Sequence, residues 1–296
     1  MPLNIDEGNV GMEAFSAKHA SDSLIAGMGK YRASRRAGSM GQQGQRLRLL
    51  TYNIQTGITT QRYRHYLTHS WKHVLPTSDR VRNLDRIANV LRNHDIVGLQ
   101  EVDAGSLRSG FINQTEYLAI KAHFPYWYQQ TNRDLGKIAQ HSLGILSKHK
   151  SNFINECKLP GVIPGRGAMM VEFGEGDDTL LVAIVHLALG KRTRMRQLAF
   201  LSELFSDYRH VIMMGDLNCQ SESREMEWLM ENSNLCQPVR GLHTFPSWRP
   251  FKSIDHILVS PTLEVGEASV LSHVYSDHLP ISMEVSLPEG LALPGH

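Results

Sequence analysis

The sequence has little of several features that would place it in a specialised class. Its 296 residues include only three cysteines, Cys157, Cys219 and Cys236, whose spacing matches no zinc-binding pattern. Three is an odd number that does not suggest a disulfide framework, so we expect reduced thiols in a reducing compartment. The net charge is only +2, whereas a protein that coats nucleic acid is usually far more basic.

Long apolar runs are also missing. No segment approaches the roughly 20 apolar residues that a membrane-spanning helix needs. The N-terminus starts acidic and lacks the apolar stretch of a signal peptide. We therefore expect a cytoplasmic protein without a transmembrane segment, and peripheral contact with the inner membrane face stays open.

Composition divides the chain into a tail and one domain. Residues 1–46 are rich in Ser, Gly, Ala, Gln and Arg and show weak apolar periodicity, which predicts a flexible N-terminal tail. Residues 47–288 form one predicted globular domain, and residues 289–296 a short C-terminal tail.

Within the domain, apolar β-prone runs alternate with segments of helical periodicity. Strands are predicted at 47–54, 95–101, 142–147, 168–173, 179–187, 210–218, 254–260, 263–272 and 281–287. The aromatic run 126–128 is interpreted as partly buried strand residues rather than a stacking platform. Helices are predicted at 79–93, 192–205 and 222–232. Several strands follow one another in the second half, so this is not a regular βαβ repeat. The pattern predicts an α/β (α+β) fold of mixed sheets packed face to face, with helices outside.

Polar residues occur at one end of the predicted core strands. Buried acids are costly unless they are paired or bind a cation, so several of them at strand ends predict one shared site at an edge of the sheets. Each residue alone also fits an ordinary role, such as a turn residue or a helix cap, and it is their joint occurrence that favours a site. The residues are Asn53, Glu101, His186, Asp216, Asn218, Asp255, His256, Asp277 and His278.

The residue types suit metal-assisted phosphoester chemistry. Mg²⁺ prefers hard oxygen ligands, which Glu101, Asp277 and the amide of Asn53 can supply. Hydrolysis also needs a base for the water and an acid for the leaving oxygen. His186 and His278 suit these roles, because histidine as a residue type titrates near neutrality.

Three further residues suit supporting roles. Asp255 is a candidate for orienting one of the histidines. Asp216 and Asn218 are two positions apart and point to the same side of a strand, so one could align the nucleophile while the other holds a phosphoryl oxygen.

Six short segments carry a resemblance that covers about residues 47–288. They are, in chain order, LLTYNIQ, DIVGLQEVD, VHLALG, MGDLN, SIDHILVS and YSDHLPI. In this order they resemble the endonuclease/exonuclease/phosphatase superfamily, which includes pancreatic-type deoxyribonucleases, apurinic endonucleases, inositol polyphosphate 5-phosphatases and bacterial sphingomyelinases. The resemblance implies a four-layer α/β sandwich with two central mixed β-sheets flanked by helices.

The resemblance also implies a role for each matched residue. Glu101 resembles the principal metal ligand, with Asn53 and Asp277 nearby, and the expected ion is Mg²⁺, with Mn²⁺ as the alternative. Asp216 and Asn218 resemble the pair that orients water and phosphate. The same resemblance makes His278, backed by Asp255, the general base and His186 the leaving-group histidine.

Two positions depart from the apurinic endonuclease branch. His186 stands where those enzymes typically use a tyrosine, and Gln55 stands where they tend to have an acidic residue. We therefore predict a divalent-metal-dependent hydrolase that cleaves a phosphodiester or phosphomonoester bond in a small or lipid substrate. An endonuclease or exonuclease is the alternative. An inactive binding module is a remote one, because every matched polar position is filled.

Substrate choice should depend on the loops around the site. Arg108, Trp248, Arg249 and Lys252 are the candidates for binding a phosphate or a phospholipid headgroup, and nucleic acid is the alternative partner. The long segment 57–78 is rich in Arg and aromatic residues, and it suits either substrate contact or a lid packed on the domain. We expect a monomer.

Overall fold

A computed structural model describes residues 44–58, 78–134, 140–161, 165–174 and 178–294. Most of the predicted N-terminal tail and of the segment 57–78 lies outside the described residues. In the part of the chain that is described, no helix combines the length and hydropathy needed to cross a membrane.

The first of two mixed sheets has six strands in the order β10-β11-β1-β2-β4-β3. Its β1 and β2 run parallel, and each of its other neighbouring pairs is antiparallel. The strands are β1 (Arg46–Asn53), β2 (Ile96–Asp103), β3 (Tyr126–Asp134), β4 (Gln140–Ser147), β10 (Glu264–Val270) and β11 (Ile281–Ser286).

The second sheet has five strands in the order β5-β6-β7-β8-β9. Here β7 and β8 run parallel, and the remaining pairs are antiparallel. The strands are β5 (Phe153–Cys157), β6 (Gly167–Phe173), β7 (Leu180–His186), β8 (His210–Asp216) and β9 (Asp255–Val259).

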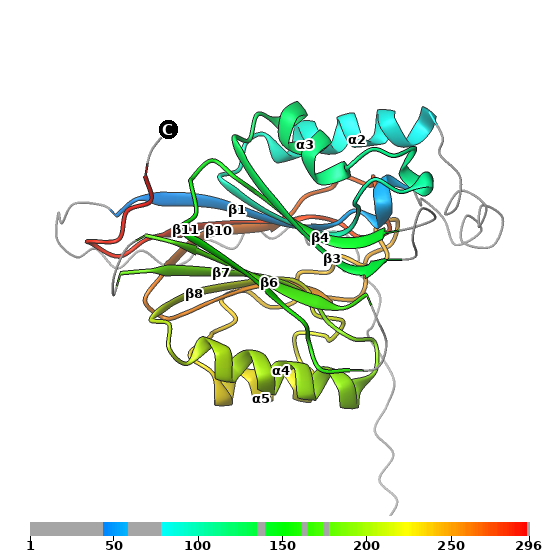
Figure 1. Ribbon diagram of the computed structural model, residues 1–296. Coiled ribbons are helices and arrows are strands. Elements are labelled where there is room, and N and C mark those ends of the chain that lie inside the picture. Colours follow the sequence, from blue (N-terminus) through cyan, green and yellow to red (C-terminus); the bar gives the residue numbers. More distant parts are fainter. Residues whose placement is uncertain (1–43, 59–77, 135–139, 162–164, 175–177, 295–296) are drawn as a thin grey trace, which may run out of the picture. The chain divides into compact units, whose positions relative to one another are not determined.

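The two sheets pack face to face, and helices cover both outer faces (Figure 1). The six-stranded sheet carries α2 (Ser78–Leu91) and α3 (Gln114–Ala122), and the five-stranded sheet carries α4 (Lys191–Phe205) and α5 (Arg224–Asn232). Short 3-10 turns, η1 (Gln55–Gly57) and η3 (Leu107–Ser109), follow β1 and β2. The predicted four-layer α/β sandwich is confirmed.

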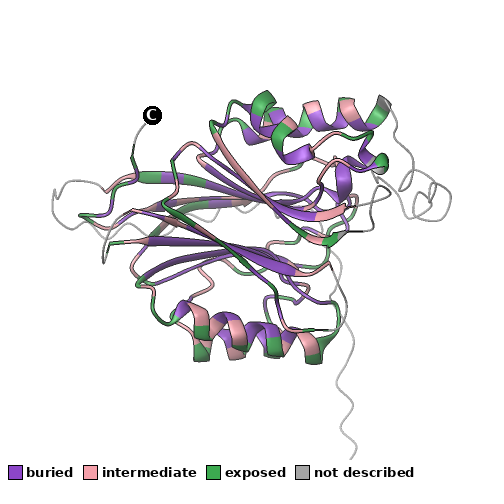
Figure 2. Cartoon of the chain, viewed as in Figure 1, coloured by how far each residue is buried: buried purple, intermediate pink, exposed green. Residues whose placement is uncertain are grey.

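Strand β7 shows how the sequence produces these layers. Every residue of β7 is buried, and the side chains alternate between the two faces of the sheet. Leu180, Val182 and Ile184 face the core between the sheets, whereas Leu181 and Val185 face the core under α4 and α5. The burial colours of Figure 2 follow the same layering, with buried residues concentrated in the two sheets. A strand covered on both faces is therefore apolar throughout.

The observed elements differ from the predicted ones in a few places. Helix α3 and strand β5 were not predicted, and β2 continues to Asp103 rather than ending at residue 101. Leu291 and Leu293 are buried in the core between the sheets, and the backbone N–H of Leu293 donates to the side chain of Gln45. The packed region therefore extends beyond residue 288, the expected end of the domain.

A buried ion pair joins the two helices of the five-stranded sheet. Arg194 of α4 is buried and donates to Glu225 of α5 over 2.6 Å. The same guanidinium donates to the backbone oxygens of Ala188 and Leu189, each over 2.9 Å. Arg194 thereby fixes the loop that follows β7.

Replacing Gly215 should disturb the end of β8. Its φ of +149° lies outside the range that other residues readily adopt, and an added Cβ would lie 2.0 Å from the backbone oxygen of Val185. Gly215→Ala should lower the free energy of unfolding by about 2–4 kcal/mol, measured by chemical denaturation. Gly190→Ser is the control, since an added Cβ there meets nothing within 4 Å, and it should change stability by less than about 0.5 kcal/mol. An equal loss of stability in Gly215→Ala and Gly190→Ser would contradict the close approach of β7 and β8 at Gly215.

Breaking the buried ion pair should have a large and pH-dependent cost. Arg194→Met leaves the Glu225 carboxylate buried without its main partner, and unfolding free energy at neutral pH should fall by about 3 kcal/mol. Burial raises the pKa of Glu225, but Arg194 outweighs it and holds that pKa below its ordinary value of 4.5. The stabilisation is therefore present above pH 4.5 and is lost as pH falls through the folded-state pKa.

Denaturation curves at several pH values test this linkage. In Glu225→Gln the free energy of unfolding should fall less steeply than in wild type as the pH is lowered below 4.5, because this carboxyl no longer takes up a proton. An unchanged pH dependence in that variant would show that Glu225 is not the group responsible.

Candidate functional site

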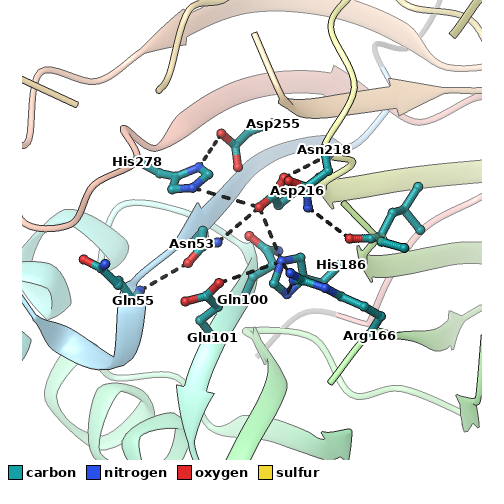
Figure 3. A network of polar contacts seen from close by, with 12 residues as sticks. Asn53, Gln55, Gln100, Glu101, Arg166, His186, Asp216, Asn218, Asp255 and His278 are labelled. Atoms are coloured by element: carbon teal, nitrogen blue, oxygen red, sulfur yellow. Dashed lines mark hydrogen bonds and ion pairs between the residues drawn. The ribbon is translucent and has the colours of Figure 1, made fainter. Parts of the chain in front are cut away.

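The site lies where the parallel strands of both sheets end. Asn53 ends β1, and Glu101 lies near the same end of β2. His186 ends β7, and Asp216 ends β8 beside it. Because these ends meet at one edge of the sandwich, side chains from both sheets converge there (Figure 3).

Asp216 lies at the centre of the contacts. Its Oδ2 accepts a hydrogen bond from Nδ2 of Asn53 at 3.2 Å and lies 3.4 Å from Nε2 of His186 and 4.0 Å from Nε2 of His278. Its Oδ1 accepts from the backbone N–H of Asn218 at 3.0 Å. Burial favours the neutral acid, but the bond to His186 and the positive charge of the two imidazoles prevail and lower the pKa of Asp216.

His278 is held by Asp255 from the other side. Its Nδ1 lies 2.8 Å from Oδ2 of Asp255, and Thr244 donates its hydroxyl to the same carboxylate oxygen. The ring of Phe245 packs against the imidazole, with 4.9 Å between the ring centroids. Burial alone would lower the pKa of His278, but the charge and hydrogen bond of Asp255 raise it well above its ordinary value.

Arg166 is part of the site although the sequence analysis did not identify it. Its guanidinium contacts the imidazole of His186, whose Nε2 also lies 3.9 Å from the Glu101 carboxylate. Arg166 immediately precedes β6, and the antiparallel register places Gly167 opposite His186. Only this register identifies Arg166 as a site residue, and a sequence alone does not reveal that β6 pairs with β7.

Glu101 lies in a β-bulge and not at a strand end. The register between β2 and β4 shifts between Leu99 and Val102, and Glu101 adopts a left-handed φ of +57°. A bulge redirects a side chain, and strained backbone tends to occur at functional sites. Burial raises the pKa of Glu101, but His186, His278 and Arg166 prevail and lower it.

The remaining predicted site residues lie close to this centre. Asn218 also has a left-handed φ, of +52°, and its Nδ2 donates to the backbone oxygen of Leu187 at 3.0 Å. The amide oxygen of Asn53 accepts from the backbone N–H of Gln55 at 3.2 Å. Asp277 is buried beside His278, and its carboxylate accepts from the hydroxyl of Ser276 at 3.1 Å.

The loop before β9 carries three of the four predicted substrate-binding residues. Trp248 is partly buried, whereas Arg249 and Lys252 are exposed. The ammonium of Lys252 lies 5.9 Å from the ring centre of Phe245, the ring that packs on His278. The fourth residue, Arg108, belongs to η3, and its side chain lies outside the described residues.

The donor atoms at this edge fit a hard divalent cation. Ligand atoms of Asp216, Asp255 and His278 lie within 4.8 Å of one another. Oδ1 of Asp255 is buried without a hydrogen-bond partner in the described part of the chain. The Glu101 side chain is 31% exposed, and no described residue donates a hydrogen bond to its carboxylate. Carboxylate oxygens with unused capacity are the hard ligands that Mg²⁺ prefers.

Known proteins share both the sequence pattern and the fold. The Endonuclease/Exonuclease/phosphatase family matches residues 50–278. The structure resembles an endonuclease/exonuclease/phosphatase from Beutenbergia cavernae at 20% identity and a TM-score of 0.63, over 82% of this chain and 72% of that one. It also resembles the mannosyl-6-phosphatase of Bacteroides thetaiotaomicron at 20% identity and a TM-score of 0.59, over 81% and 100% of the two chains.

A third similar structure is sphingomyelinase C from Streptomyces griseocarneus, at 16% identity and a TM-score of 0.58, over 81% of this chain and 99% of that one. At these identities the three structures establish the shared fold and no more. No curated protein matches the chain in sequence. The family match covers most of the chain and includes every residue of the site from Asn53 to His278, so the protein belongs to the endonuclease/exonuclease/phosphatase family of hydrolytic phosphoesterases.

Proposed function

We propose that this protein is a Mg²⁺-dependent phosphoesterase that hydrolyses a phosphodiester or phosphomonoester bond of a small or lipid substrate. The observation that carries the proposal is a buried carboxylate between two imidazoles, with Oδ2 of Asp216 3.4 Å from His186 and 4.0 Å from His278. In-line attack at phosphorus needs proton transfer on two sides of the reacting centre, and two separate histidines supply it.

Glu101, Asn53 and Asp277 would hold the metal. Ligand atoms of Asp216, Asp255 and His278 lie within 4.8 Å of one another, but the imidazole of His278 is bound to Asp255 at 2.8 Å. The Glu101 carboxylate, by contrast, receives no hydrogen bond from the described residues. When bound, Mg²⁺ supplies Lewis acidity that stabilises negative charge on the phosphoryl oxygens.

His278 acts as the general base. Asp255 binds Nδ1 of His278, which leaves Nε2 directed toward Asp216 and the interior of the site. Nε2 takes a proton from the attacking water, and Asp255 stabilises the imidazolium that forms. Asp216 and Asn218 orient the water and a phosphoryl oxygen.

His186 assists the leaving group from the five-stranded sheet. Its imidazole lies between Asp216 and Arg166, and donates a proton to the leaving oxygen. The guanidinium of Arg166 next to it suits a phosphoryl oxygen, because the guanidinium group is a permanent cation with several donors.

The proposed small or lipid substrate matches the names of two proteins with the same fold, a mannosyl-6-phosphatase and a sphingomyelinase. The loop residues Trp248, Arg249 and Lys252 are proposed to contact the substrate. Nucleic acid is the second candidate, and the net charge of +2 disfavours it because duplex binding uses many phosphate contacts. We further propose a cytoplasmic location, which suits three free cysteines.

A substrate panel tests the proposal. Turnover of aryl phosphodiesters, sugar phosphates, phosphoinositides, sphingomyelin and plasmid DNA should be measured with Mg²⁺, Mn²⁺ and Ca²⁺ and after chelation. Metal-dependent hydrolysis of a small or lipid phosphoester supports it. Turnover of DNA alone, or no hydrolysis under any condition, would contradict it.

Removing His186 should affect substrates according to their leaving groups. An alkoxide with a pKa of about 15 needs a proton to depart, whereas a nitrophenolate with a pKa near 7 hardly needs one. His186→Ala should therefore reduce kcat on an alkyl phosphoester by about 10²–10⁴-fold and on a nitrophenyl ester by much less. His278→Ala should reduce both. If His186→Ala reduced kcat equally on the two substrates, His186 would not be the general acid. Its imidazole would instead stabilise the charge of a phosphoryl oxygen.

Asp255→Asn should shift the pH dependence of turnover. His278 accepts a proton only in its neutral form, and the Asp255 carboxylate raises its pKa. Without that charge the pKa of His278 falls, so the acidic limb of the pH–rate profile should move to lower pH. The maximum rate should also fall, by about 10²–10⁴-fold, because the imidazole loses its orienting partner. An acidic limb at the wild-type pH would exclude Asp255 as the group that tunes the base.

A further inference from the structure

Large exposed apolar side chains gather at the edge of the molecule that carries the site. Among the described residues six are exposed, and four of them lie in loops at this edge. These are Leu107, Phe111, Leu189 and Phe251, which are 39%, 63%, 73% and 58% exposed. The other two, Ile120 and Phe153, lie on helix α3 and at the far end of β5.

Leu189 follows His186 by three residues and is held outward. Both nearby backbone oxygens, those of Ala188 and Leu189 itself, accept hydrogen bonds from the buried Arg194 at 2.9 Å. The backbone is thus fixed from the protein interior, while the leucine side chain remains in solvent.

Phe251 belongs to the loop that packs on His278. Its backbone N–H donates to the backbone oxygen of Phe245 at 3.0 Å, and Phe245 contacts the imidazole of His278. The ammonium of Lys252 lies 5.6 Å from the ring centre of Phe251. An exposed ring and a cation are therefore held together beside the site.

Phe111 and Leu107 belong to the loop that leaves β2 two residues after Glu101. The ends of this loop are joined by the bridge between Ala104 and Asn113, and the backbone N–H of Phe111 donates to the oxygen of Ser106 at 2.8 Å. The loop thus protrudes from the site edge as a compact unit with an exposed phenylalanine.

The charge of these loops has one sign. Segments 104–113, 187–192 and 244–252 contain no aspartate or glutamate, and Lys191, Arg192, Arg249 and Lys252 are exposed on them. Isolated apolar side chains next to lysine and arginine suit the interface of an anionic bilayer, where the apolar groups enter the lipid and the cations meet the headgroups.

We propose that these three loops form a membrane-binding face that places the site directly on an anionic lipid surface, where the substrate phosphoester is presented. This inference rests on the proposed phosphoesterase function and adds the physical form of its substrate. A groove for a protein partner is less suited, because the apolar groups lie on separate loops. Nucleic acid is less suited because two of the four exposed side chains are leucines, which offer no ring for a base to stack on.

Vesicle binding of the full chain tests the proposal with matched variants. The site-edge variant carries Phe111→Ser, Leu189→Ser and Phe251→Ser, and the control carries Ile120→Ser and Phe153→Ser. Cosedimentation should use phosphatidylcholine vesicles with and without phosphatidylserine. Wild type and control should bind the anionic vesicles alike, and the site-edge variant at least about tenfold more weakly. Added salt should weaken binding, and vesicles without phosphatidylserine should bind poorly.

Hydrolysis of a soluble nitrophenyl phosphodiester, measured on the same three proteins, separates this inference from the proposed function. All three proteins should turn it over within about twofold, because none of the substitutions touches a catalytic group. If the proteins hydrolyse the soluble substrate but do not bind vesicles, the proposal of a membrane-binding face is wrong. The same holds if the site-edge variant and the control bind vesicles equally. In both cases the proposed phosphoesterase function still stands. Vesicle binding with no hydrolysis of any substrate would instead overturn the proposed function. Duplex DNA binding should be measured on the same proteins. If the site-edge variant lost DNA binding but bound vesicles like wild type, the face would bind nucleic acid instead of a membrane.

Discussion

The hydrogen bond between Asn53 and Asp216 joins the two sheets at the point where the site is built. Asn53 ends β1 of the six-stranded sheet, Asp216 ends β8 of the five-stranded sheet, and their side chains meet at 3.2 Å. The close apposition of two apolar sheets brings these ends together, and polar groups buried there must satisfy one another. The site therefore depends on the register of both sheets, and a shift in either would separate its two halves.

Carboxylates and imidazoles alternate at this buried edge, so each charged group adjoins one of opposite sign. Asp216 lies between His186 and His278, and His278 lies between Asp216 and Asp255. The pKa of Asp216 is lowered because the two imidazoles adjoin it, whereas burial alone would favour its neutral form. The arrangement holds two imidazoles in different surroundings, which suits one to accept a proton and the other to donate one.

Much of the fold could be predicted because its central strands are apolar from end to end. Strands β7 and β8 are buried along their whole length, so their sequences admit few other interpretations. Strand β5 was missed because it is an edge strand with mostly exposed residues, and it lacks an apolar signal. Helix α3 was missed because its buried face includes the polar Gln114 and Thr115.

Sequence reasoning found the site residues that lie at or beside the end of an apolar strand. His186 and Asp216 follow that rule, and the structure places them side by side. Arg166 lies before a strand and reaches the site through the pairing of β6 with β7, which one sequence does not reveal. The bulge at Glu101 was hidden for a similar reason, since it exists only in the register between β2 and β4.

We propose that the acidic groups at this edge bind a divalent cation through Glu101. Calorimetric titration of Mg²⁺ into the full chain at neutral pH tests it without any assumption about substrate. Wild type should bind Mg²⁺ saturably, and Glu101→Gln should bind it at least about tenfold more weakly, because a neutral amide is a poorer ligand for a hard cation. Equal affinity in the two proteins, or no binding to wild type, would contradict it.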